Sequence, residues 1–244
     1  MVLIMDIMFL KNCGLLLSGA HSRIVIDGFN GRSDCFDCLS DEEFADFYEG
    51  KERFDNVRAL IFTHKHSDHF DERRVGKYME KYRDCSLITP ENITVGTGVR
   101  GVAGASGDPG DVFRFTLDDF EISLMDTGHS GQEYADVLHC SILIKMCGKT
   151  VYVAGDSDYA RKGIPTELKN ESVDIAFFNP FYLSTPGGRR QMTEINSKIN
   201  YIYHLPIDTD DVYGLKRLAQ RNAERYEGTL PALSFLPENM VYIR

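Results

Sequence analysis

Three histidines and one aspartate crowd the six-residue segment His64-Lys65-His66-Ser67-Asp68-His69. The whole chain has only seven histidines, and these three directly follow the apolar run Ala59-Leu60-Ile61-Phe62. Imidazole nitrogens and carboxylate oxygens are the ligands that zinc and similar divalent ions prefer. Two histidines one residue apart can reach one ion from the same side of an extended turn, and the adjoining Asp-His pair can reach a second. The spacing therefore predicts a metal site at the end of a buried strand, rather than a polar turn with unrelated histidines.

Three further candidate ligands, His129, Asp156 and His204, each follow an apolar run that is typical of a strand. Two of them have glycine and serine neighbours, in Gly-His-Ser and Gly-Asp-Ser. Asp27 also follows a short apolar run, which ends Val25-Ile26. Side chains at strand ends meet along one edge of a sheet even when they are far apart in sequence. The positions therefore predict that these residues join the first cluster.

The ordered set His-x-His-x-Asp-His, Gly-His-Ser, Gly-Asp-Ser and a last strand-end histidine resembles the motifs of the metallo-β-lactamase-fold hydrolases. The resemblance covers nearly the whole chain. It implies an α/β fold, a four-layer αββα sandwich of two mixed β-sheets flanked by helices, as a single domain over residues 1–244. The short loops look most similar to the branch that includes L-ascorbate-6-phosphate lactonase. The chain departs from that branch at Lys11-Asn12-Cys13-Gly14, where the branch often has Gly-His-Ser.

The resemblance also implies a binuclear metal site and the role of each ligand. The implied ligands are His64, His66 and His129 for the first ion, Asp68, His69 and His204 for the second, and Asp156 as a bridge between the two ions. Asp27 and Thr63 are expected to orient ligand histidines by hydrogen bonds. The expected ions are two divalent cations, zinc first, with manganese or iron as alternatives because the same ligands suit them.

The resemblance implies a metal-dependent hydrolase in which a metal-bound hydroxide cleaves an ester, lactone or phosphodiester of a small molecule. Asp68 is expected to move a proton while it binds metal. Arg189 and Arg190 are candidates to bind a substrate anion, although solvated loop arginines are the simpler interpretation. The alternatives are a phosphodiesterase or nuclease, and a mononuclear-iron dioxygenase or thioester hydrolase of the same fold. A di-iron reductase and a scaffold protein without catalysis are disfavoured, because His66 and all seven ligands are in place.

The remaining sequence indicates how these residues are positioned. Apolar runs predict strands at residues 7–17, 23–26, 57–62, 86–89, 112–115, 120–125, 138–145, 150–154, 173–179, 199–203 and 241–244. Capping residues and amphipathic patterns predict helices at residues 40–48, 72–83 and 213–226. The glycine-rich segments 91–110 and 182–190 are expected to be irregular. His139, on a predicted strand, is expected to be packed and hydrogen-bonded rather than a ligand, and His21 and Lys65 to be exposed.

Composition limits the partners of this 244-residue chain. Its net charge is −10 and it has no clustered lysine and arginine, which disfavours long nucleic acid and leaves a small anionic molecule as the expected substrate. No apolar run reaches the ~18 residues of a membrane span, and the acidic start disfavours a secretion signal, so a cytoplasmic protein is expected. Six dispersed cysteines predict free thiols, including the lone pair Cys35 and Cys38. A homo-oligomer remains open.

Overall fold

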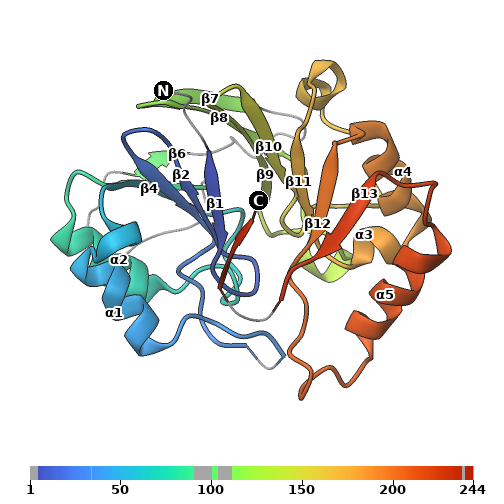
Figure 1. Cartoon of the computed structure of the whole chain (residues 1–244), viewed down its shortest axis with the longest axis horizontal. Helices are drawn as coiled ribbons and strands as arrows, with labels where there is room; N and C mark the ends of the chain where they lie inside the picture. Colours follow the sequence, from blue (N-terminus) through green and yellow to red (C-terminus); the bar gives the residue numbers. More distant parts are fainter. Residues whose placement is uncertain (1–4, 34, 91–100, 104–111, 238–239, 244) are drawn as a thin grey trace.

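Two mixed β-sheets pack face to face, with helices on both outer sides, in the computed structural model of this chain (Figure 1). The structure describes residues 5–33, 35–90, 101–103, 112–237 and 240–243. The predicted four-layer αββα sandwich is therefore confirmed.

The first sheet changes from antiparallel to parallel pairing at its centre. Its strand order is β14-β1-β2-β3-β4-β5-β6. The bounds in that order are Val241–Ile243, Asp6–Phe9, Leu15–Ser18, Arg23–Ile26, Val57–Ile61, Ser86–Thr89 and Gly101–Ala103. Strands β14 to β3 are antiparallel, and the pairs from β3 to β6 are parallel. The parallel half brings the ends of β3 and β4 side by side, which places Asp27 next to the histidine-rich segment.

The second sheet has the same division into halves. Its order is β13-β12-β11-β10-β9-β8-β7. The bounds in that order are Ala232–Phe235, Ile199–Ile202, Ile175–Phe178, Lys149–Val153, Cys140–Met146, Phe120–Asp126 and Val112–Leu117. Strands β10 to β13 are parallel and β7 to β10 antiparallel. The remaining candidate ligands follow β8, β10 and β12 in this sheet.

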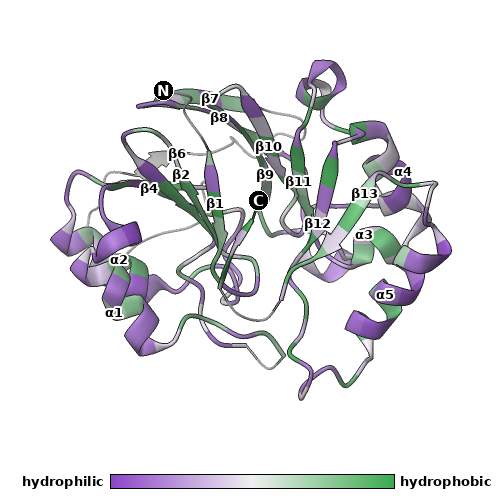
Figure 2. Ribbon diagram, in the orientation of Figure 1, coloured by the Kyte–Doolittle hydropathy of each residue, from purple (hydrophilic) through white to green (hydrophobic). Residues whose placement is uncertain are grey.

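Alternation along the strands builds three apolar layers. Ile24 and Ile26 of β3 face the core between the sheets, whereas Val25 faces the helices on the outer side. Helices α1 (Asp41–Glu49) and α2 (Glu72–Lys81) cover the first sheet. Helices α3 (Phe181–Ser184), α4 (Pro186–Ile195) and α5 (Leu215–Arg225) cover the second. Figure 2 shows the polar faces of these helices turned outward. The sheets are thus fixed as a rigid frame for the residues at their ends.

Helix ends follow the capping chemistry of the sequence. Ser40 accepts a hydrogen bond from the Glu43 backbone, and the Glu43 side chain accepts one from the Ser40 backbone, so the capping box is complete. Gly50 ends α1 in the left-handed conformation. Asp71 caps α2 through the Arg74 backbone N–H. The first two predicted helices are therefore confirmed to within about two residues at their ends.

Two expectations about segments were wrong. The strand expected over residues 7–17 is divided into β1 and β2, because Asn12 has a left-handed φ of 51° and Gly14 N–H bonds back to the Lys11 carbonyl. The irregular loop expected over residues 182–190 is helical. Thr185 caps α4, and proline follows it at the first helical position, where no N–H is needed. Packing requires glycine at position 188 of this helix, since a Cβ on Gly188 would lie 2.4 Å from the Tyr182 Cα.

Most of the expected irregular segment 91–110 lies outside the described residues. Residues 101–103 within it form strand β6, which pairs with β5. Among the described residues, no helix is long and apolar enough to cross a bilayer.

Candidate metal centre

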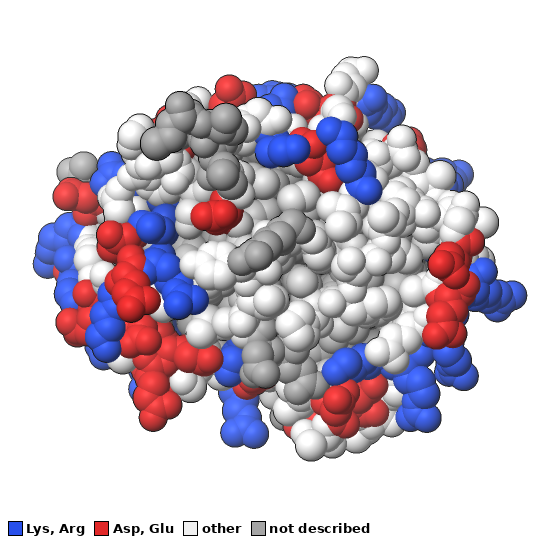
Figure 3. Space-filling view, viewed as in Figure 1, with Lys and Arg blue, Asp and Glu red and all other residues white. Residues whose placement is uncertain are grey.

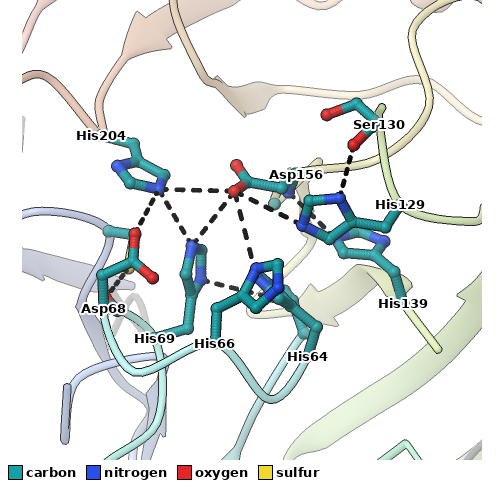
Figure 4. A network of polar contacts seen from close by, with 12 residues as sticks. His64, His66, Asp68, His69, His129, Ser130, His139, Asp156 and His204 are labelled. Carbon is teal, nitrogen blue, oxygen red and sulfur yellow. Dashed lines mark hydrogen bonds and ion pairs between the residues drawn. The ribbon is translucent and has the colours of Figure 1, made fainter. Parts of the chain in front are cut away.

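All seven predicted ligands converge at one edge of the sandwich (Figure 4). Their donor atoms form overlapping groups in which every atom lies within 4.8 Å of the others. One group is His64, His66 and His129, a second is Asp68, His69 and His204, and a third is His64, His69 and Asp156. The third group joins the first two. This division into two sets of three donors with an aspartate between them is the one expected from the sequence.

Asp27 organises the histidine-rich segment from below. Its side chain is fully buried, and it follows β3 with a left-handed φ of 46°. One carboxylate oxygen accepts a hydrogen bond from the Thr63 N–H at 2.8 Å, and the other accepts one from the Thr63 hydroxyl at 2.7 Å. The second oxygen also lies 3.0 Å from Nδ1 of His69. Asp27 and Thr63 therefore make the contacts with the histidines that were predicted for them.

These outer contacts decide which ring nitrogens carry protons. Nδ1 of His69 donates to the Asp27 carboxylate, and Nδ1 of His129 donates to the Ser130 carbonyl at 2.7 Å. Nδ1 of His64 donates to the Thr63 oxygen at 3.0 Å, because that hydroxyl gives its own hydrogen to Asp27. In a neutral ring the other nitrogen is then a bare acceptor. Nε2 of His129 is buried without a hydrogen-bond partner among the described residues.

Asp156 lies at the centre of the cluster. Its Oδ1 accepts a hydrogen bond from the Asn179 side chain at 3.0 Å. Its Oδ2 is turned to the ring nitrogens, at 3.9 Å from His64, 3.6 Å from His69, 3.8 Å from His129 and 3.5 Å from His204. Asn179 thus holds one carboxylate oxygen and leaves the other between the two donor sets.

Close packing behind Asp156 requires Gly155. This glycine has a φ of 59°, and a Cβ there would lie 2.6 Å from Nε2 of His139. His139 is buried, and its Nε2 accepts the backbone N–H of Asp156 at 2.9 Å. Its Nδ1 lies 3.0 Å from the Thr127 hydroxyl. His139 is therefore a packed, hydrogen-bonded residue, as predicted, and it fixes the backbone that presents Asp156.

The second donor set depends on the turn between β1 and β2. His204 has a left-handed φ of 54°, and its backbone N–H bonds to the Asn12 carbonyl at 2.8 Å. The Asn12 side chain in turn donates to the Asp68 carbonyl at 2.8 Å. The Cys13 thiol lies 3.3 Å from the same carbonyl oxygen. Strained backbone of this kind persists where the surrounding structure holds it, and it is typical of functional sites.

Burial and neighbouring charges shift the pKa values in this cluster. Burial lowers the pKa of His64. Burial and the neighbouring His129 ring lower the pKa of His66. Burial opposes protonation of His204 as well, but the nearby carboxylates of Asp156 and Asp68 raise its pKa to about 9. Burial alone would raise the pKa of Asp68, but its hydrogen bond with His204 holds it below the usual value. Both carboxylates thus remain ionised, as a cation site requires.

The donor set fits divalent cations. The Asp68 and Asp156 carboxylates are ionised, and no Lys or Arg contact neutralises them among the contacts of the described residues. Nε2 of His69 and Nε2 of His204 lie only 3.0 Å apart. Such a short distance between two imidazole nitrogens is favourable only when a proton or a cation lies between them. Geometry and protonation therefore both match metal ligation.

The structure does not bring the two candidate arginines into this cluster. Arg189 donates to the Leu183 carbonyl at 2.6 Å, and its guanidinium lies 4.1 Å from the Tyr226 ring centre. Arg190 reaches the Arg161 carbonyl at 3.5 Å. Both belong to helix α4 and contact neighbouring helices and loops. Sequence reasoning missed Asn179 instead, although its place directly after β11 is the same strand-end signal that identified the ligands.

Comparison with solved structures gives a plain answer about the fold. No family model and no curated protein matches the sequence. The metallo-β-lactamase fold protein YhfI from Bacillus subtilis aligns with this chain at a TM-score of 0.63 and 14% identity. The alignment covers 98% of this chain and 99% of YhfI. This chain has the metallo-β-lactamase fold. At this identity, the fold is what the likeness establishes.

Two more proteins share the metallo-β-lactamase fold of this chain. Igni18, a metallo hydrolase from the archaeon Ignicoccus hospitalis, aligns over 98% of both chains, with a TM-score of 0.62 and 14% identity. CmlA, a diiron β-hydroxylase from Streptomyces venezuelae, aligns with 98% of this chain at a TM-score of 0.67 and 12% identity. This chain spans only 54% of CmlA. The fold thus carries both hydrolytic and oxidative metal chemistry in its known members.

Proposed function

We propose that this protein is a metal-dependent hydrolase that acts on a small molecule at a binuclear site. The observation that carries the proposal is the convergence of two three-donor sets on the two sides of Asp156. His64, His66 and His129 would hold one ion, Asp68, His69 and His204 the other. Ions bound there lower the pKa of coordinated water and polarise a carbonyl or phosphoryl oxygen, which supplies the chemistry of hydrolysis.

The residues of the chain contribute orientation and proton transfer. Asp27 and Thr63 hold His69 and His64 with their outer N–H groups engaged, so that the inner nitrogens stay free for an ion. Asn179 and His139 hold Asp156 from two sides. Asp68 lies 3.4 Å from His204 and borders the cavity, which places its carboxylate where it could exchange a proton at the reacting centre.

The proposed substrate is an ester, a lactone or a phosphodiester. The proposed metal is zinc. The Gly-His-Ser and Gly-Asp-Ser segments favour the branch that includes L-ascorbate-6-phosphate lactonase. An acidic chain with interspersed surface charges supports a small substrate rather than long nucleic acid (Figure 3).

The test is elemental analysis of the purified protein together with activity on a lactone, an ester, a thioester and a phosphodiester. About two zinc or manganese ions per chain, with hydrolysis of one substrate class, support the proposal. Asp156→Asn should lose activity, and His21→Ala should serve as a matched control because His21 is exposed and outside the cluster. A folded protein that binds no metal after addition of excess ions refutes the proposal. Bound iron with oxygen consumption and no hydrolysis would assign an oxidative function instead.

A further inference from the structure

A cavity of about 330 Å³ opens over the candidate metal centre. Five of the proposed ligands form its floor: His66, Asp68, His129, Asp156 and His204. Its walls are apolar or aromatic, and they consist of Phe36, Tyr134, Pro180, Phe181 and Leu215, with Ser67 and Asn179 beside them. This volume lies at the small end of the ~300–1,000 Å³ range of ligand pockets. No lysine or arginine is among the described residues that line it.

Aromatic rings from two segments border the two donor sets. The Phe36 ring meets the edge of the His204 ring, with centroids 4.2 Å apart. The Tyr134 ring lies 4.9 Å from the rings of both His66 and His129. Phe181 is 43% exposed at the mouth, although it lies at the start of a packed helix. A substrate whose reacting bond sits at the ions therefore has its neighbouring groups among carbon atoms.

Three cations near this region are engaged with other partners, and Lys65, which lies between two ligand histidines, is exposed and outside the cavity lining. Arg189 lies over the Tyr226 ring, and its guanidinium donates to the Leu183 carbonyl. The Lys11 ammonium lies 3.1 Å from Asp37. Lys216 is one residue after Leu215, and it pairs with Asp208 at 2.7 Å. A second anionic group on a substrate would thus enter the cavity without a cationic side chain to receive it.

We infer that the group attached to the reacting bond is uncharged and apolar, of the size of an aryl ring or a short branched alkyl chain. The inference rests on the proposed hydrolase function and names its substrate class. Moving a charged group from water into a site that offers no ionic or hydrogen-bond partner costs free energy, whereas the removal of apolar surface from water is favourable. The lining thus gives no support to the anionic substrate expected from the sequence.

The experiment compares two hydroxamates that present the same metal-binding head to the zinc-loaded protein. 4-Methylpentanohydroxamate ends in an uncharged isopropyl group, and succinate monohydroxamate ends in a carboxylate of nearly the same shape. Their dissociation constants are measured by isothermal titration calorimetry. We expect the uncharged compound to bind at least about tenfold more tightly, because only the carboxylate must be desolvated without a partner.

Two variants test whether the walls cause the preference. Leu215→Lys places a cation in the cavity and should reduce or reverse the preference for the uncharged compound. Tyr242→Lys adds the same charge on strand β14, outside the cavity lining, and should leave the preference unchanged. Equal binding of both compounds, tighter binding of the carboxylate, or no response to Leu215→Lys overturns the inference. Folded protein that binds no metal after addition of excess ions refutes the proposed hydrolase itself, so the two failures are distinguishable by metal content.

Discussion

Asp27→Asn tests the link between the buried carboxylate and metal affinity. Three donors point at Asp27: the Thr63 N–H, the Thr63 hydroxyl and Nδ1 of His69. An amide has one acceptor oxygen, so its N–H group would face either the Thr63 N–H or both the Thr63 hydroxyl and Nδ1 of His69. His69 can avoid this clash by moving its proton to Nε2, which is the nitrogen turned toward His204 and Asp156. Asparagine tolerates the left-handed φ of 46° at this position, so the substitution should not change the backbone conformation.

The magnitude follows from the role of such outer contacts. Loss of a hydrogen-bond partner behind a ligand histidine typically reduces metal affinity about 10- to 100-fold. That corresponds to ~1.4–2.7 kcal/mol of binding free energy. At ion concentrations that saturate both proteins, the stabilisation by metal against unfolding should fall by the same ~1.4–2.7 kcal/mol.

The assay is zinc affinity by competition with a chelator, together with urea unfolding of ion-free and zinc-loaded protein. Asp174→Asn is the matched control. Asp174 also accepts a backbone N–H, from Thr150 at 2.9 Å, and pairs with Lys198, but it belongs to none of the groups that could hold an ion. It should lower stability without changing zinc affinity. Unchanged zinc affinity in Asp27→Asn, with the fold intact, would refute the reasoning.

Four further outcomes are expected. Gly155→Ala should cost at least ~1–2 kcal/mol of stability, since alanine is strained at a φ of 59° and its Cβ would contact His139; urea unfolding measures this, and wild-type stability would contradict it. Asn179→Ala should lower kcat, because Asp156 loses the hydrogen-bond donor to its Oδ1, and circular dichroism should show that the fold is retained. His139→Ala should weaken zinc binding, whereas His21→Ala should not. Zinc affinity should rise at least ~tenfold per pH unit below the His204 pKa of about 9, because the raised pKa values of His204 and His69 make an ion compete with bound protons; flat affinity from pH 6 to 9 would refute this.

Strand-end positions explain why the ligand cluster was predictable. Each of His64, His129, Asp156 and His204 comes within three residues after a β-strand, where the chain leaves the sheet. The parallel halves of the two sheets bring several of those ends to the same edge. Residue type, order and position after an apolar run were therefore sufficient signals that these side chains converge.

Local patterns were misleading where packing decides conformation. The Pro186-Gly187-Gly188 segment has the composition of a loop, but it begins a helix that Thr185 caps, and Gly188 is glycine because Tyr182 packs so closely that no Cβ fits there. Asn12 interrupts an apolar run and turns the chain, and its carbonyl then receives the His204 N–H. Such contacts join residues far apart in the chain, so a window of sequence does not contain their cause.

The sequence by itself determined the chemistry of the centre: which imidazoles and carboxylates are present, in what order, and that each follows a strand. Only the tertiary structure decided how they are held and what they face. Asn179 and His139 reach Asp156 from positions next to β11 and β9 of the second sheet, and Phe36 and Tyr134 border the cavity from unrelated segments. The physical reason is that ligation depends on residue type, whereas orientation and cavity lining depend on contacts between distant segments, which form only when the two sheets pack.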